Sequence, residues 1–100
     1  MNKEKTQQIR EQILPIIKAY KINYAAIFGS FARGENKKDS DLDLLVNFSE
    51  PVSYFDLVEV EQKIARKIKI KKVDLVTLAA LHPLIRKSVN KDLKVIYDQR

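Results

Sequence analysis

Two aspartates and a Gly-Ser pair have a spacing in this sequence that suggests chemistry. Gly29 and Ser30 follow the apolar segment "YAAIF", and ten residues later Asp41 and Asp43 flank a leucine in "DLDLLVNF". Side chains two apart on a strand project from one face, so these carboxylates would lie side by side. Such like charges repel unless a cation lies between them. The pattern predicts a divalent-cation site beside a phosphate-binding turn, as in transfer from a metal-bound nucleoside triphosphate.

Two other known motifs match the spacing in this region, but each lacks a residue type that it requires. The span 29–34 has the glycine spacing of a P-loop, but that loop continues with Lys and Ser or Thr, and here Glu35 follows. The acids in 39–50 have the spacing of an EF-hand, but the position that needs glycine for the sharp turn holds Leu44. We therefore exclude both motifs.

Composition indicates one small globular domain over residues 1–100. Hydrophobic residues make up 45% and charged residues 32% of the 100 residues, enough for a single core. The chain has no cysteine and one histidine, His82, which we expect to cap a helix. A metal ion would therefore be bound mainly by oxygen ligands, which favours Mg²⁺, Mn²⁺ or Ca²⁺ over Zn²⁺. No apolar run approaches the ~20 residues of a membrane span, and no signal-peptide pattern opens the chain, so we expect a cytoplasmic protein.

The net charge of +6 suggests an anionic partner, but the basic residues are unevenly distributed. Six of them fall within residues 63–72: Lys63, Arg66, Lys67, Lys69, Lys71 and Lys72. This basic run could bind nucleic acid or an acidic protein. A solvated helix end is the interpretation that we favour, because charge runs commonly do no more than solvate a surface.

Hydrophobic periodicity predicts a small α/β or α+β sheet with helices packed on it. The expected elements are helices over 4–20, 53–68 and 83–90, strands over 24–28, 41–48, 72–78 and 93–98, a helical turn at 31–33 and a polar loop over 34–40. Pro15 should kink or divide the first helix, since proline removes a backbone donor. Ser53 and Asp56 resemble a capping box at the start of the second. The last strand is expected at an edge of the sheet.

These residues resemble the minimal nucleotidyltransferases of the DNA polymerase beta superfamily, whose signature is Gly-Ser, ten residues, then Asp-x-Asp. Gly29-Ser30 and Asp41-Leu42-Asp43 match that count, with the family's "ARG" and "SD" at 32–34 and 40–41. The third family carboxylate lies on the following strand, where "VDLV" places Asp74. With a matching tail over 82–98, the resemblance spans nearly the whole chain.

The resemblance implies a mixed sheet with helices on one side and assigns a role to each matched residue. Two Mg²⁺ ions, or Mn²⁺, would be held at the site, and Asp74 would also activate the acceptor hydroxyl. The assigned residues are Asp41, Asp43 and Asp74 for the metals, Gly29 and Ser30 for the β- and γ-phosphates of ATP, and Arg33 for a phosphate.

Each assigned residue also has an ordinary structural interpretation. Gly29 and Ser30 could form a strand-to-helix turn with Ser30 as the helix N-cap. Asp41 could begin its strand in solvent, Asp43 could pair with Lys37 or Lys38, and Asp74 could pair with Lys72. For Arg33, a solvated loop position is as good an account as a phosphate contact.

The resemblance also implies a partner, because minimal members commonly act as antitoxins beside a HEPN-domain toxin. The expected activity is transfer of AMP from ATP to a tyrosine of that partner, within a hetero-oligomer. Two alternatives stay open: an antitoxin that binds nucleotide without catalysis, and an RNA nucleotidyltransferase that holds its substrate with the basic run.

Overall fold

The elements follow the predicted order along the chain. A computed structural model describes residues 3–35 and 40–100. Its helices are α1 (Lys3–Ala19), α2 (Gly29–Arg33), α3 (Tyr54–Ile68) and α4 (Pro83–Asp92), its strands β1 (Ile22–Phe28), β2 (Leu42–Phe48), β3 (Val73–Thr77) and β4 (Lys94–Asp98), with a short 3₁₀ turn, η1 (Leu78–Ala80). Periodicity missed only η1, where the Thr77 hydroxyl accepts a hydrogen bond from the Ala80 N–H. The central part of the predicted 34–40 loop, residues 36–39, lies outside the described residues.

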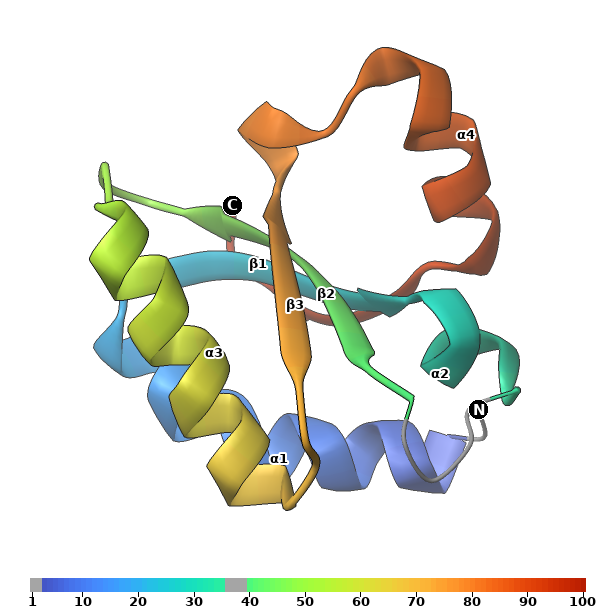
Figure 1. The fold of residues 1–100 in the computed structure, drawn as a ribbon, viewed down its shortest axis with the longest axis horizontal. Helices are drawn as coiled ribbons and strands as arrows, with labels where there is room; N and C mark the ends of the chain where they lie inside the picture. Colours follow the sequence, from blue (N-terminus) through green and yellow to red (C-terminus); the bar gives the residue numbers. More distant parts are fainter. Residues whose placement is uncertain (1–2, 36–39) are drawn as a thin grey trace.

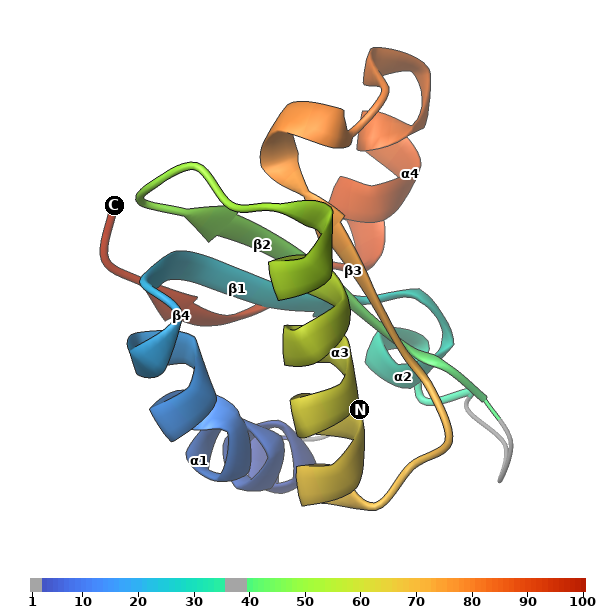
Figure 2. The same cartoon turned by 60° about the vertical axis from the view of Figure 1, so that its left-hand side comes forward.

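The four strands form one mixed sheet in the order β3-β2-β1-β4; Figure 1 labels the first three, and Figure 2 also labels β4. β1 is antiparallel to both of its neighbours, and β2 and β3 are parallel. A parallel pair needs a crossover, and α3 supplies it. The mixed sheet and the edge position of β4 agree with the sequence-based expectation.

Helices cover both faces of this sheet. The larger hydrophobic cluster joins α1 and α3 to one face and includes Ile13, Ile17, Val60 and Ile64. A smaller cluster on the other face lies under η1 and α4 (Figure 2); its buried members are Tyr24, Ala26, Leu45, Leu81 and Val89. The expectation of helices on one side is therefore wrong. Because side chains alternate along a strand, apolar side chains also lie on the second face, and a helix must shield them from water.

Local sequence signals define the long helices. Of the two effects predicted for Pro15, division is excluded because α1 continues through it to Ala19, and a kink stays a prediction. Ile13 and Ile17, on either side of the proline, are both buried and hold the helix against the core. At the start of α3 the predicted capping box is confirmed, since the Ser53 hydroxyl accepts from the Asp56 N–H at 3.2 Å and the Asp56 carboxylate accepts from the Ser53 N–H at 3.2 Å.

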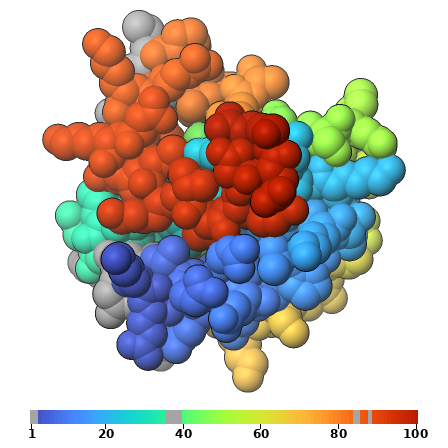
Figure 3. Space-filling model, turned by 180° about the vertical axis from the view of Figure 1, so that it is seen from behind, coloured from blue at the N-terminus to red at the C-terminus, as the bar shows by residue number. Residues whose placement is uncertain are grey.

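Side chains from the helices bind backbone groups of both outer strands. Arg10 of α1 donates to the Ile96 carbonyl of β4 at 2.8 Å, and Figure 3 shows α1 running alongside the C-terminal segment. On β3, the Leu75 N–H donates to the Glu61 carboxylate of α3 at 2.8 Å. Exposed strand edges invite pairing with other chains, and each of these bonds occupies one backbone group of an outer strand. The second bond also fixes β3 beside Asp74.

Candidate functional site

The three predicted metal-binding aspartates lie at the start of two parallel strands. Asp43 of β2 is the direct register partner of Asp74 of β3, and both lie on the face that α4 partly covers. Asp41 precedes β2 by one residue, where the Leu42 N–H donates to the Lys72 carbonyl at 3.1 Å and extends the pairing. The fold thus brings together carboxylates that are 31 positions apart in the sequence (74 − 43).

Lys72 contacts two of these carboxylates. Its Nζ lies 3.5 Å from Asp74 Oδ1 and 3.9 Å from Asp41 Oδ2. The pairing of Asp74 with Lys72, raised above as an alternative, is therefore present in the structure. The side chains of Asp41 and Asp74 keep 40% and 39% of their surface exposed, so water screens these ion pairs and each contributes at most about 1 kcal/mol.

The environment of Asp43 raises the pKa of its carboxyl group. Burial raises the pKa of its carboxyl group, and the neighbouring carboxylates of Asp74 and Asp41 raise it further. Arg33 and Lys72 act in the opposite direction but do not cancel the shift in pKa. The site therefore lacks positive charge around Asp43, and a cation placed there would stabilise the ionised carboxylate.

The residues at this site fit a magnesium ion by their chemistry. All three side chains offer carboxylate oxygen, the donor that Mg²⁺ and Mn²⁺ prefer. Among the described residues, no three His, Cys, Asp or Glu side chains are gathered as closely as a bound ion requires. Lys72 instead contacts two of the acids, so side-chain rotation would have to accompany metal binding.

Gly29 is required where β1 meets α2. Its φ of +75° lies in the left-handed region, and a Cβ at this position would overlap Asp43 Oδ2. Only glycine therefore lets the backbone approach this carboxylate so closely. Ser30 is the second residue of α2, whose N-cap is Phe28, so the alternative in which Ser30 caps the helix is wrong. The turn places Gly29 directly beside Asp43.

Arg33 joins α2 to α4. Its Nη1 lies 3.1 Å from Asp92 Oδ2 and its Nε 3.3 Å from Glu35 Oε2, and these two acids raise the pKa of the guanidinium. A phosphate at Arg33 would have to compete with both carboxylates. No pattern in the sequence pointed to Asp92 as a partner. The pairing of Asp43 with Lys37 or Lys38 falls outside the described residues.

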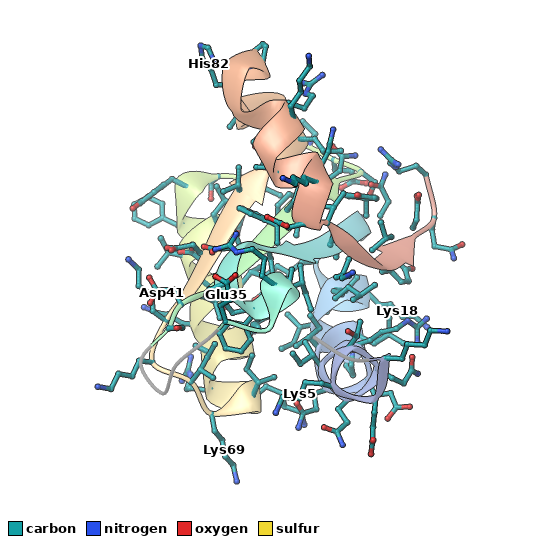
Figure 4. All side chains as sticks on the ribbon, turned by 90° about the vertical axis from the view of Figure 1, so that its right-hand side faces the viewer. Lys5, Lys18, Glu35, Asp41, Lys69 and His82 are labelled. Atoms are coloured by element: carbon teal, nitrogen blue, oxygen red, sulfur yellow. The ribbon has the colours of Figure 1, made fainter. Side chains whose placement is uncertain are left out.

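His82 and Lys69 lie away from the aspartates, whereas Lys72, in the same basic run as Lys69, contacts two of them. Figure 4 shows Asp41 and Glu35 on the same side of the molecule, with His82 at the far tip beyond α4 and Lys69 pointing outward at the opposite end. All six residues of the basic run are exposed, as the solvated interpretation requires. Two hollows of about 610 and 450 Å³ lie on the helices of the other face, and Lys67 lines both. We call this surface of α1 and α3 the helical face.

The sequence matches a known family over almost its whole length. Residues 11–100 match the family described as "Polymerase beta, Nucleotidyltransferase". In the part of the chain that the structure describes, no helix has the length and apolar character to cross a bilayer.

Individual relatives and solved structures agree with this family match. A relative from Methanocaldococcus jannaschii with the provisional name protein adenylyltransferase is 44% identical over 75 residues, 74% of this chain and 76% of its own. The protein adenylyltransferase MntA of Thermococcus cleftensis is 34% identical over 91 residues, 83% of this chain and 91% of its own. The fold matches a chain in the solved complex of a tri-AMPylated HEPN toxin of Shewanella oneidensis with its MNT antitoxin, with a TM-score of 0.72 and 21% identity over 94% of this chain and 73% of that one.

Proposed function

Since the chain belongs to the polymerase beta nucleotidyltransferase family, we propose that it transfers AMP from ATP to a tyrosine hydroxyl of a HEPN-domain toxin and acts as the antitoxin. The observation that carries this proposal is the register pairing of Asp43 with Asp74, with Gly29 packed against Asp43. The names of the adenylyltransferase relatives and the AMPylated HEPN complex support the choice of nucleotide and acceptor.

In this proposal the aspartates hold the metals and the Gly-Ser turn holds the triphosphate. Asp41, Asp43 and Asp74 would bind two Mg²⁺ or Mn²⁺ ions, which supply positive charge to the phosphates during transfer. Gly29 and Ser30 would contact the β- and γ-phosphates. Arg33 could add a phosphate contact if it exchanged Asp92 and Glu35 for the ligand, since its guanidinium is exposed.

In the proposed transfer step, Asp74 acts as the general base. Its carboxylate would accept the proton of the tyrosine hydroxyl, and the phenolate oxygen would form a bond to the α-phosphorus of ATP. The bond between that phosphorus and the oxygen that bridges to the β-phosphate breaks, and pyrophosphate leaves. The product is a tyrosine–AMP diester.

The HEPN partner supplies the acceptor in this proposal, and the two proteins form a hetero-oligomer in the cytoplasm. The complex of an AMPylated HEPN toxin with its antitoxin supports this arrangement. Residues 1–100 would act as one minimal nucleotidyltransferase domain.

Labelled ATP tests the proposal directly. The chain, a HEPN protein and Mg²⁺ are incubated with ATP labelled at the α- or the γ-phosphate. Label from the α-phosphate should appear on a partner tyrosine, label from the γ-phosphate should not, and EDTA should abolish the transfer. Neutralisation of the toxin without any transfer would replace the proposal with an antitoxin that only binds, and label on RNA instead would replace it with an RNA nucleotidyltransferase.

A further inference from the structure

Lys72 occupies a position that the proposed transfer reaction does not explain. It lies one residue before β3, and its carbonyl accepts from the Leu42 N–H at 3.1 Å, so its backbone is fixed against β2. Its side chain lies on the same side of the strand as Asp74, two residues later. The ammonium contacts both Asp74 and Asp41, which belong to different strand segments.

We propose that Lys72 is a counterion of the metal site, whose ammonium competes with the divalent cation for Asp41 and Asp74. The inference rests on the proposed function, because it takes these aspartates as the metal ligands. In the metal-free protein, Lys72 offsets part of the repulsion among the three carboxylates. A divalent cation that binds to Asp41 and Asp74 displaces the ammonium and loses affinity for that reason.

The displaced ammonium couples metal binding to nucleotide binding. A triphosphate carries several negative charges, and the ammonium of Lys72 gains a new partner when metal and nucleotide bind together. The metal alone offers no such compensation. ATP should therefore tighten metal binding more in the wild-type chain than in a chain without this lysine, which is a positive coupling between the two ligands.

Two other cations, Arg33 near the site and Lys63 of the basic run, have different partners. Arg33 is held by Asp92 and Glu35. Lys63, at the start of the basic run, lies 3.4 Å from Glu59 and 5.0 Å from the centre of the Tyr20 ring, on the helical face. Lys72 thus differs from Arg33 and Lys63 by its contacts with two aspartates of the site.

Titration with Mn²⁺, followed by the electron paramagnetic resonance signal of the unbound ion, tests the inference without measuring activity. Lys72→Met removes the competing charge, and Lys67→Met on the helical face removes the same charge elsewhere. Without nucleotide, Lys72→Met should bind Mn²⁺ about three- to tenfold more tightly than wild type, as expected for the loss of two screened ion pairs. Lys67→Met should bind as wild type does.

The same titration with ATP separates this inference from the proposed function. ATP should tighten Mn²⁺ binding less in Lys72→Met than in wild type. In a chain that already carries Asp74→Asn, Lys72→Met should increase Mn²⁺ affinity by a smaller factor than it does in the wild-type chain. Unchanged affinity in Lys72→Met, or an equal gain in Lys67→Met, would overturn the counterion role alone. If wild type with ATP binds no more Mn²⁺ than ATP alone does, the metal site and the proposed function both fail.

Discussion

The two faces of the sheet differ in what their strand side chains do. Among the described residues, sixteen buried side chains form the cluster under α1 and α3, whereas five form the cluster under η1 and α4. On the second face, Leu45 of β2 and Val76 of β3 are apolar, whereas Asp43 and Asp74, two residues earlier on the same strands, are acidic. One face therefore supplies most of the hydrophobic stabilisation, which leaves the other able to hold repelling carboxylates.

The basic run shows the same contrast in charge. Lys63 and Lys67 lie on the helical face, where Lys67 lines both hollows. Lys72, from the same run, contacts Asp41 and Asp74. A stretch that is continuous in the sequence thus contributes to two different surfaces of the molecule.

The largest effect that separates the two faces should come from Asp43→Asn. Loss of this central carboxylate should abolish AMP transfer, while circular dichroism shows a folded chain, because the main cluster lies on the opposite face. Lys67→Met, on the helical face, should keep wild-type transfer. Substantial transfer by Asp43→Asn in the α-labelled ATP assay would contradict the assignment of the site.

Asp74→Asn should have the next largest effect. If Asp74 accepts the acceptor proton, transfer should fall by at least ~100-fold, the low end for a positioned general base. ATP binding in the presence of Mg²⁺, measured by calorimetry, should persist through the remaining residues. Near-normal turnover would mean that Asp74 serves only as an ion-pair partner of Lys72.

Gly29→Ala tests whether the backbone must approach Asp43 closely. Gly34→Ala is the matched control, since both glycines have φ of +75°. Each substitution should cost about 1–2 kcal/mol for the left-handed backbone. In Gly29→Ala the new Cβ also displaces the Asp43 carboxylate, so we expect a larger loss of stability in urea unfolding and a loss of transfer that Gly34→Ala does not share. Equal effects would contradict the close approach.

A smaller effect concerns the stability of the metal-free chain. Because the folded state raises the pKa of Asp43, the ionised carboxylate destabilises the fold at neutral pH. Asp43→Asn should therefore be more stable than wild type in EDTA at pH 7. The difference should shrink as the pH falls and vanish below the ordinary aspartate pKa of about 3.9. Urea unfolding at several pH values measures it, and a destabilised variant at pH 7 would contradict the repulsion.

The smallest effect should follow charge reversal on the helical face. The triple variant Lys63→Glu, Arg66→Glu, Lys67→Glu should associate more slowly with an acidic HEPN partner, and this association should depend less on salt, with dissociation little changed. Surface plasmon resonance at several salt concentrations measures both rates. A weakened affinity for RNA with a shallower salt slope would instead indicate nucleic-acid binding.

Several features of the site could be predicted from short-range patterns. The alternation in "DLDLLV" places Asp41 and Asp43 on one face of their own strand, and the capping box at Ser53 starts α3, because both depend on residues a few positions apart. The short apolar segment before Gly29 likewise predicts a strand that ends at the Gly-Ser turn. The role of Asp74 as the third carboxylate is predicted only by the family resemblance, because the sequence of its own strand does not indicate which strand lies beside it.

Only the tertiary structure decided what lies across from each of these residues. The register of Asp43 with Asp74, the contact of Lys72 with Asp41, the pairing of Arg33 with Asp92 and the cover of the second face by α4 all join distant segments. Periodicity determines the direction of a side chain relative to its own helix or strand. The choice of neighbouring strand and register depends on how the whole set of apolar faces is buried together, and a local pattern carries no information about that.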